Sequence, residues 1–294
     1  MSERLKTILI VGGGSAGWMA AALLSHLFQG LYRIKLVESE DIGTVGVGEA
    51  TIPAIKKFNE LLELDEVQFM RLTQGTFKLG IQFNNWDRIG SSYIHGFGVI
   101  GQDLGWLRCH QYWLKMKLQG EASDFANFSI NTAAALENKF MPARADAGDS
   151  PIGHIAHAYH FDAGLYARFL RTYAEERGVE RQEGRIVNAA LRNSDGFVES
   201  VTLDSGLKIE ADFYIDCSGF RGLIIEQAMK TGFEDWTHWL PCDRAIAIPC
   251  ERSENFTPYT MATAHGAGWL AHTASASHGQ RACLFQSIHG RSGS

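Results

Sequence analysis

Apolar and polar positions alternate along this chain in blocks that predict an α/β protein. Residues 7–11, TILIV, form a continuous apolar run of the kind found in a strand that is buried on both faces. The segment WMAAALLSHLF, residues 18–28, predicts a helix, and RIKLVE, residues 33–38, predicts a second buried strand. A strand, a helix and a strand in this order predict a βαβ unit with parallel strands.

Segments in the second half of the chain predict a return to the same sheet. GRIVNAALR, residues 184–192, fits a strand. GFVESVTLDSGLKIEADFYIDCSG, residues 196–219, is typical of a hairpin that is followed by a buried strand ending at Asp216. Between them and the first βαβ unit, DAGLYARFLRTYAEE, residues 162–176, predicts a helix with Asp162 as its N-cap.

A glycine-rich turn joins the first strand to the first helix. GGGSAG, residues 12–17, fits the pattern G-x-G-x-x-G, and an acid ends the second strand about 20 residues later. In this context glycines let the backbone turn tightly and approach a pyrophosphate, while the helix N-terminus attracts the phosphates. The alternative is a glycine turn that binds nothing. We predict a dinucleotide site formed by Gly12, Gly14, Ser15, Ala16, Gly17 and Glu38.

The position of the later strand distinguishes between FAD and NAD as the dinucleotide. A strand that arrives about 200 residues after the glycines and returns to the first sheet favours FAD over NAD. We expect Asp216 and Gly219 near the diphosphate, and Ile186 and Val187 beside the adenine.

Composition narrows the class of partner. The chain is 45% hydrophobic and 20% charged, which is typical of a soluble globular protein, and its net charge is −6. Because no cluster of Lys and Arg is present, we expect neither nucleic acid nor a membrane surface as a partner, but a small molecule. The five cysteines are far apart, so we expect no disulfide framework, no metal site and a cytoplasmic location. The composition is also compatible with a homodimer.

Five segments together identify a family. GGGSAGWMAA, VGVGEATIPAI, GTFKLGIQFNNW, HFDAGLYARFL and DCSGFRGLII follow one another between residue 7 and about residue 269. In this order they resemble the flavin-dependent halogenases of the tryptophan halogenase family. The resemblance implies a Rossmann-like FAD-binding fold with an interwoven substrate region. It also implies chlorination or bromination of tryptophan, indole or a related electron-rich aromatic compound.

The resemblance assigns cofactors and a catalytic lysine. Reduced FAD comes from a separate flavin reductase and activates oxygen, chloride or bromide is oxidised to hypohalous acid, and a lysine delivers the halogen to the ring. Lys78, in the segment GTFK, matches that lysine. From the residues alone, a lysine in the strand-like alternation TFKLGIQF could equally point into water.

The segment VGVGEATIP resembles the family's strap beside the flavin, which would carry flavin and halide contacts. Its residues are Val45, Gly46, Val47, Gly48, Glu49, Ala50, Thr51, Ile52 and Pro53. Glu49 could instead be only a loop cap. On the substrate side we expect His95, Phe97 and Trp113, although core packing explains the aromatic residues equally well. We assign His160 a structural role at the start of the helix that Asp162 caps.

We expect one halogenase-type domain over residues 1–269, with a flavin-binding sheet at 1–60 and 155–230 and a substrate side at 61–154 and 231–269. The alternatives are an FAD-dependent aromatic hydroxylase, which needs no lysine, and an inactive, truncated fragment that binds only flavin.

The last segment, residues 270–294, shows neither strand alternation nor a helical stripe. The family carries Trp-x-Trp-x-Ile-Pro near this point and a catalytic glutamate further on, and neither has a counterpart here. A shift of one base at Leu270 permits codons that restore the second tryptophan and the Ile-Pro pair. We therefore expect an out-of-frame tail and a missing C-terminal part of the family fold, which sequencing of the coding DNA tests.

Overall fold

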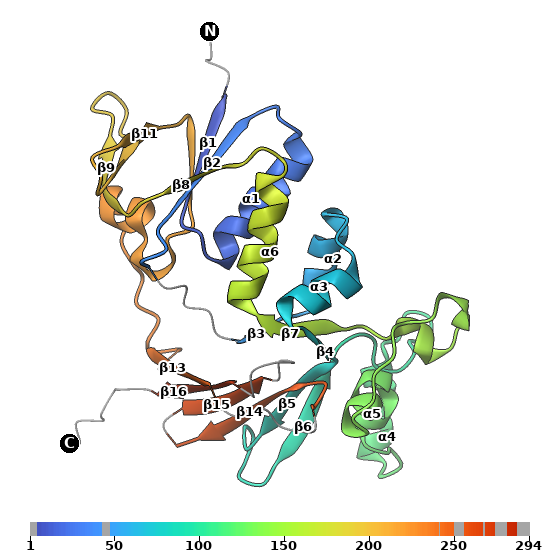
Figure 1. Cartoon of the computed structure of the whole chain (residues 1–294). Coiled ribbons are helices and arrows are strands. Elements are labelled where there is room, and N and C mark those ends of the chain that lie inside the picture. Colours follow the sequence, from blue (N-terminus) through green and yellow to red (C-terminus); the bar gives the residue numbers. More distant parts are fainter. Residues whose placement is uncertain are drawn as a thin grey trace, which may run out of the picture. The chain divides into compact units, whose positions relative to one another are not determined.

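The computed structural model describes residues 5–42, 48–240, 242–249, 256–266, 268–273 and 281–286, with the backbone alone at 48, 49, 249 and 281–286. The chain forms two compact units, each assembled from separate stretches of sequence (Figure 1). The first unit comprises Met1–Gly46, Asn59–Thr73 and Asp162–Asp235. The second comprises Val47–Phe58, Gln74–Phe161 and Trp236–Ser294.

The first unit contains a parallel sheet with the strand order β12-β1-β2-β8. Its strands are β1 (Thr7–Val11), β2 (Arg33–Glu38), β8 (Glu180–Glu183) and β12 (Phe213–Asp216). The helices α1 (Ser15–Phe28) and α6 (Ala163–Glu175) lie side by side against it (Figure 1). Apolar runs without alternation therefore became parallel strands with covered faces, as predicted.

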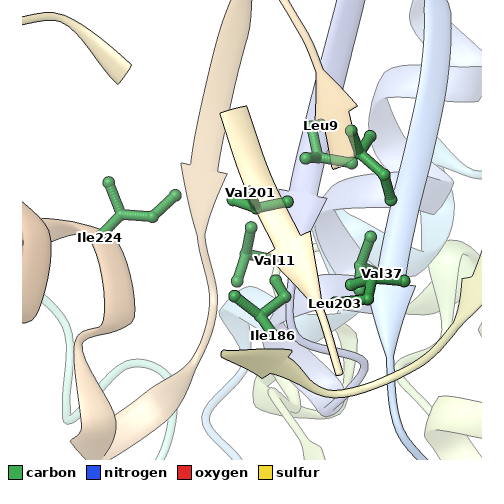
Figure 2. Close-up of a cluster of buried hydrophobic side chains, with 8 residues drawn as sticks. Leu9, Val11, Val37, Ile186, Val201, Leu203 and Ile224 are labelled. Atoms are coloured by element: carbon green, nitrogen blue, oxygen red, sulfur yellow. The ribbon is translucent and has the colours of Figure 1, made fainter. Parts of the chain in front are cut away.

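A second, antiparallel sheet of this unit has the order β11-β10-β9. Its strands are β9 (Ile186–Leu191), β10 (Val198–Leu203) and β11 (Lys208–Glu210), which confirms the predicted strand and hairpin. Figure 2 shows apolar side chains of both sheets meeting in one core. Its members are Leu9, Val11, Val37, Ile186, Val201, Leu203, Ile209 and Ile224. Ile224 comes from the helical turn η5 (Leu223–Ala228), which follows the short turn η4 (Gly219–Arg221).

The helix α3 (Glu66–Thr73) belongs to the first unit, whereas we predicted residues 61–73 on the substrate side. The reason is its apolar face, which packs on α6: the Phe69 and Tyr166 rings meet edge to face, with centroids 5.6 Å apart. The Tyr173 hydroxyl also donates a hydrogen bond to the Leu62 carbonyl, at 2.8 Å. The preceding helix, α2 (Ala54–Leu61), crosses the boundary between the units.

The second unit contains two sheets. A small sheet has the order β3-β7-β4, with β3 (Gly48–Ala50), β4 (Thr76–Lys78) and β7 (Ala158–Asp162). A larger sheet has the order β13-β16-β15-β14-β5-β6. Its strands are β5 (Gly80–Asn84), β6 (Ser92–Gly96), β13 (Arg244–Pro249), β14 (Thr260–His265), β15 (Gly268–Thr273) and β16 (Arg281–Gln286).

Helical segments complete the second unit. They are α4 (Cys109–Leu118), α5 (Ile130–Leu136) and the short turns η1 (Phe125–Phe128), η2 (Ala145–Ala147) and η3 (Pro151–His154). A small core forms where Leu79, Ala135 and Ile155 meet. Among the described residues, no helix combines the length and apolar character that crossing a bilayer requires.

Residues 268–273 and 281–286 form strands, although the tail sequence lacks the alternation of a strand. Backbone groups make the pairing: β15 pairs with β14 on one side and with β16 on the other, both antiparallel. Hydrogen bonds between main chains do not require a side-chain pattern, so sequence periodicity could not predict these strands. The reading-frame hypothesis stays a prediction.

Candidate functional site

Two positions of the GGGSAG turn must be glycines because backbone atoms of the first unit lie very close to them. Gly12 has a φ of +107°, and a Cβ atom there would lie 2.3 Å from the Cys217 carbonyl oxygen. A Cβ atom on Gly17 would lie 1.9 Å from the carbonyl oxygen of Gly12. Since real Cβ atoms do not approach so closely, β1, α1 and the end of β12 meet this tightly only because these residues are glycines.

Gly14 differs from Gly12 and Gly17, because a Cβ atom there would meet nothing within 4 Å. Gly14 is the N-cap of α1, and no side chain caps the helix. The first turn, with Ser15 and Ala16, therefore leaves its amide groups and the positive end of the helix dipole facing open space. Gly219, whose φ is +64°, likewise has nothing within 4 Å. This open cradle fits a diphosphate.

Glu38 ends β2 beside the turn, and other groups of the chain hold its carboxylate. The Trp18 indole donates to Glu38 Oε2 at 3.2 Å, and the Arg181 guanidinium donates to Oε1 at 2.5 Å. Gly13 must also be a glycine here, because a Cβ atom would lie 1.6 Å from Glu38 Oε2. The sequence argument did not assign Gly13 any role. The carboxylate is therefore held in a fixed orientation at the end of β2, next to the glycine turn.

Asp216 holds the end of β12 in place. Its carboxylate accepts hydrogen bonds from the Ser218 side chain at 2.6 Å and from the backbone amides of Ile224 and Ile225 at 2.8 and 3.0 Å. Burial opposes ionisation, but these hydrogen bonds prevail and lower the pKa of Asp216. Ile186 lies in the core, whereas the neighbouring Val187 is 57% exposed and stays a candidate for ligand contact.

Lys78 is the last residue of β4, at the point where the chain leaves one sheet for another. TFKLGIQF is not one strand: β4 pairs with β7 in the small sheet, and β5 joins β6 and β14 in the larger one. Leu79, between them, donates its amide to the Pro258 carbonyl at 2.7 Å. Its carbonyl accepts hydrogen bonds from the Phe97 amide at 2.8 Å and the Asn131 side chain at 3.3 Å. The backbone after Lys78 is thus held on both sides.

The Lys78 side chain is buried, with only 2% of its surface exposed, so the alternative of a solvated strand lysine is wrong. Its Nζ lies 5.5 Å from the centroid of the Phe97 ring. No described carboxylate lies within ion-pair distance of it. Burial disfavours the ammonium form and lowers the pKa of Lys78 to about 8. The structure thus provides an amine that can gain or lose a proton near neutral pH.

His160 lies diagonally across from Lys78 on the same face of the small sheet. It is 1% exposed, and its Nε2 lies 2.9 Å from the Thr260 hydroxyl. Burial, and then the charge of Lys78, lower the pKa of His160 to about 3, which keeps the imidazole neutral.

The segment 48–53 is attached to the other side of β7. Thr51 Oγ1 donates to the Tyr159 carbonyl at 2.9 Å and accepts a hydrogen bond from the Tyr159 amide at 3.1 Å. Ala50 ends β3, Ile52 is 58% exposed and Pro53 is half-buried. Val45, Gly46, Val47 and the side chain of Glu49 lie outside the described residues. One strand, β7, therefore lies between the segment that resembles the strap and the strand of Lys78.

Comparison with known proteins identifies the family. A family model described as tryptophan halogenase matches residues 7–274. The chain belongs to the tryptophan halogenase family. The match reaches five residues beyond Trp269, where the resemblance of the segments stops.

Solved structures of halogenases share the fold. A flavin-dependent halogenase from Xanthomonas campestris superposes with a TM-score of 0.90 at 44% identity, covering 97% of this chain and 56% of that one. BrvH, a flavin-dependent halogenase from Brevundimonas, superposes with a TM-score of 0.89 at 42% identity, covering 98% and 58% of the two chains. The fold is thus the α/β, Rossmann-type fold of flavin-dependent halogenases, as predicted.

Among curated relatives, the tryptophan 7-halogenase RebH of Lentzea aerocolonigenes is 37% identical over 290 residues. The alignment covers 92% of this chain and 53% of RebH. The chain therefore spans about half the length of the curated relatives it matches.

The structure brings one of the three predicted substrate residues to Lys78. Phe97 is buried under the amine, whereas His95 is exposed on β6. Trp113 packs on Phe125, with ring centroids 4.7 Å apart, and donates its indole N–H to the Ser123 carbonyl. The sequence argument also missed His160 as a neighbour of Lys78. The register of β4 against β7 makes them neighbours, and a single sequence does not reveal that register.

Proposed function

We propose that this chain is the FAD-binding and lysine-bearing portion of a flavin-dependent halogenase that acts on tryptophan, indole or a related electron-rich aromatic compound. The burial of Lys78, with which no described carboxylate pairs, carries the proposal, together with the family membership. A flavin hydroxylase shares the cofactor but does not need such an amine, and burying an unpaired amine costs stability. Retention of the amine therefore favours halogenation.

The first unit supplies groups that fit FAD. Gly14, Ser15 and Ala16 would hold the diphosphate on the open first turn of α1, and Glu38 would accept hydrogen bonds from the ribose. Bound and reduced, FAD would supply the oxygen-activating chemistry that oxidises chloride or bromide. A separate flavin reductase would provide the reduced cofactor.

Lys78 would supply the chemistry of the second unit. As an ammonium it can donate a hydrogen bond to hypohalous acid, and as a neutral amine it can carry the halogen as a haloamine. A pKa of about 8 makes both forms accessible near neutral pH. The burial of the side chain and the Phe97 ring beside Nζ would keep other nucleophiles away from the halogen.

The test combines the protein with FAD, a flavin reductase, NADH, bromide or chloride and a panel of indoles, and identifies products by mass spectrometry. Halogenated product that disappears in Lys78→Met, but persists in the exposed-lysine control Lys139→Met, is the expected result. Hydroxylated product without halogenated product would establish the hydroxylase instead.

Flavin binding is measured separately, by quenching of FAD fluorescence. FAD binding without any product would identify a flavin-binding fragment, and failure to bind FAD would refute the assignment of the first unit. Both lysine variants should bind FAD as the wild type does, because neither Lys78 nor Lys139 is among the residues proposed to contact the cofactor.

A further inference from the structure

The pairing of β4 with β7 sorts their side chains onto two faces. Lys78 lies opposite Ala158, and Thr76 lies opposite His160. Residues two apart on a strand share a face, and paired residues share it too, so these four side chains lie together. Ala158 is small and fully buried, so it leaves room for the aliphatic part of the Lys78 side chain. His160 is the diagonal neighbour of Lys78.

The opposite face is aromatic and does not compete for Lys78. Phe77 stacks on Phe140 with ring centroids 3.8 Å apart, and Tyr159 and His157 pack around the pair. This packing anchors β4 from behind. The orientation of Lys78 is therefore determined by what lies on its own face.

His160 connects that face to the larger sheet. Its Nε2 is 2.9 Å from Thr260 Oγ1 on β14, and its Nδ1 is 3.4 Å from Thr76 Oγ1 on β4. Thr260 is 6% exposed, so the contact is enclosed. Near it, the Leu79 amide binds the Pro258 carbonyl just before β14. A side-chain bridge and a backbone bridge thus join the two sheets next to Lys78.

The bridge adds no charge beside the amine. His160 is the titratable group that faces Lys78 among the described side chains, and His157 and Tyr159 lie on the other face of β7. A neutral imidazole can donate through one ring nitrogen and accept through the other. It therefore satisfies hydroxyl groups on two sheets without repelling an ammonium ion.

We propose that His160 is a positioning residue for Lys78: its hydrogen bond to Thr260 closes the junction between β7 and β14 and keeps water from the Lys78 amine. The importance of this enclosure for halogen transfer rests on the proposed function. The enclosure itself is a property of the folded chain and can be measured without any reaction.

The test is an NMR titration of the Lys78 amine in protein with 13C- and 15N-labelled lysine. The Lys78 signal is assigned as the one missing from Lys78→Met. Thr260→Val removes the hydroxyl but keeps the shape, His160→Leu removes the imidazole, and Thr260→Ser is the matched control that keeps the hydroxyl. Circular dichroism and a urea unfolding curve establish that each variant is folded.

In the wild type and in Thr260→Ser we expect the pKa of Lys78 near 8. In Thr260→Val and His160→Leu, water reaches the amine and the pKa rises toward 10.5 by about one unit or more, which lowers the neutral fraction about tenfold near pH 7. If His160→Leu does not fold, the isosteric Thr260→Val decides.

A Lys78 pKa that stays near 8 in folded Thr260→Val would overturn the role of His160. A wild-type value near 10.5 would overturn the enclosure altogether. The protein could show the expected Lys78 titrations and bind FAD, but form no halogenated product. That result would refute the proposed function while leaving the positioning role of His160 in place.

Discussion

Replacing Lys78 by methionine is expected to stabilise the protein at neutral pH, by an amount that fades in strong base. The wild-type side chain is 2% exposed, and no described carboxylate pairs with it. Its ammonium form therefore loses hydration on folding without regaining an ion pair. Methionine is unbranched and similar in length, so it can occupy the same space without that loss.

The magnitude follows from the pKa of Lys78, which falls from its ordinary value of 10.5 to about 8 on folding. Because the folded-state pKa is the lower one, the unfolded chain binds more protons between these pH values, and stability rises with pH there. Each pKa unit corresponds to about 1.4 kcal/mol, so the buried ammonium costs about 3 kcal/mol at pH 7. The cost declines to about 2 kcal/mol at pH 9 and below about 0.5 kcal/mol at pH 10.5.

Urea unfolding followed by tryptophan fluorescence at pH 7, 9 and 10.5 measures this difference. Side-chain packing of methionine adds an offset that is the same at every pH, so the pH dependence isolates the lysine charge. The exposed Lys139→Met variant of the same unit is the control and should show no such dependence. A stability difference for Lys78→Met that does not change between pH 7 and 10.5 would refute the burial of an unpaired ammonium.

Four further predictions concern the first unit. Gly17→Ala should lower the free energy of unfolding by about 1–3 kcal/mol, because its Cβ atom would meet the Gly12 carbonyl at 1.9 Å. Gly14→Ala should cost less than about 1 kcal/mol in urea unfolding but weaken FAD binding at least about tenfold in fluorescence titration. Asp216→Asn should lower the free energy of unfolding by about 1–3 kcal/mol, because a side-chain amide cannot accept hydrogen bonds from both Ser218 and the two backbone amides. In the wild type, the stability that the Asp216 carboxylate contributes should be lost as the pH falls through its lowered pKa. The variant should show no such loss. Tyr173→Phe should cost about 1 kcal/mol by thermal or urea unfolding, because the Leu62 carbonyl loses its donor, and an unchanged stability would contradict that hydrogen bond.

The first unit was largely predictable because its signals are local. A continuous apolar run, a glycine turn and a helical stripe each determine the conformation of their own segment. The strands β1 and β2 form at the predicted residues, and α1 covers its predicted residues but begins earlier, at Ser15. The Asp162 cap was equally local, and its carboxylate accepts from the Leu165 amide at 2.9 Å. The packing of α3 on α6 is not local, and the periodicity of the sequence did not predict it.

The surroundings of Lys78 could not be derived from periodicity, because three distant segments create them. The strand read through TFKLGIQF breaks at Leu79 because its backbone groups find partners at Pro258, Phe97 and Asn131. Alternation correctly separated Phe77 from Lys78, but it could not tell that the polar face would be covered by β14. The sequence argument therefore identified the lysine through family resemblance, whereas the residues alone left open a solvated lysine, which the burial of Lys78 rules out.

The position of β7 between two functional segments links these observations. On one side Thr51 exchanges two hydrogen bonds with Tyr159, and on the other Thr76 and Lys78 pair with His160 and Ala158. Any displacement of β7 must therefore move the lysine strand, the segment after β3, or both. His160 also ties β7 to β14. The buried Lys78 ammonium costs stability, and a looser junction would relieve that cost by admitting water. The attachment of β7 to β14 keeps the Lys78 amine enclosed, and the hydrogen bond between His160 and Thr260 is the part of that attachment that a single substitution removes.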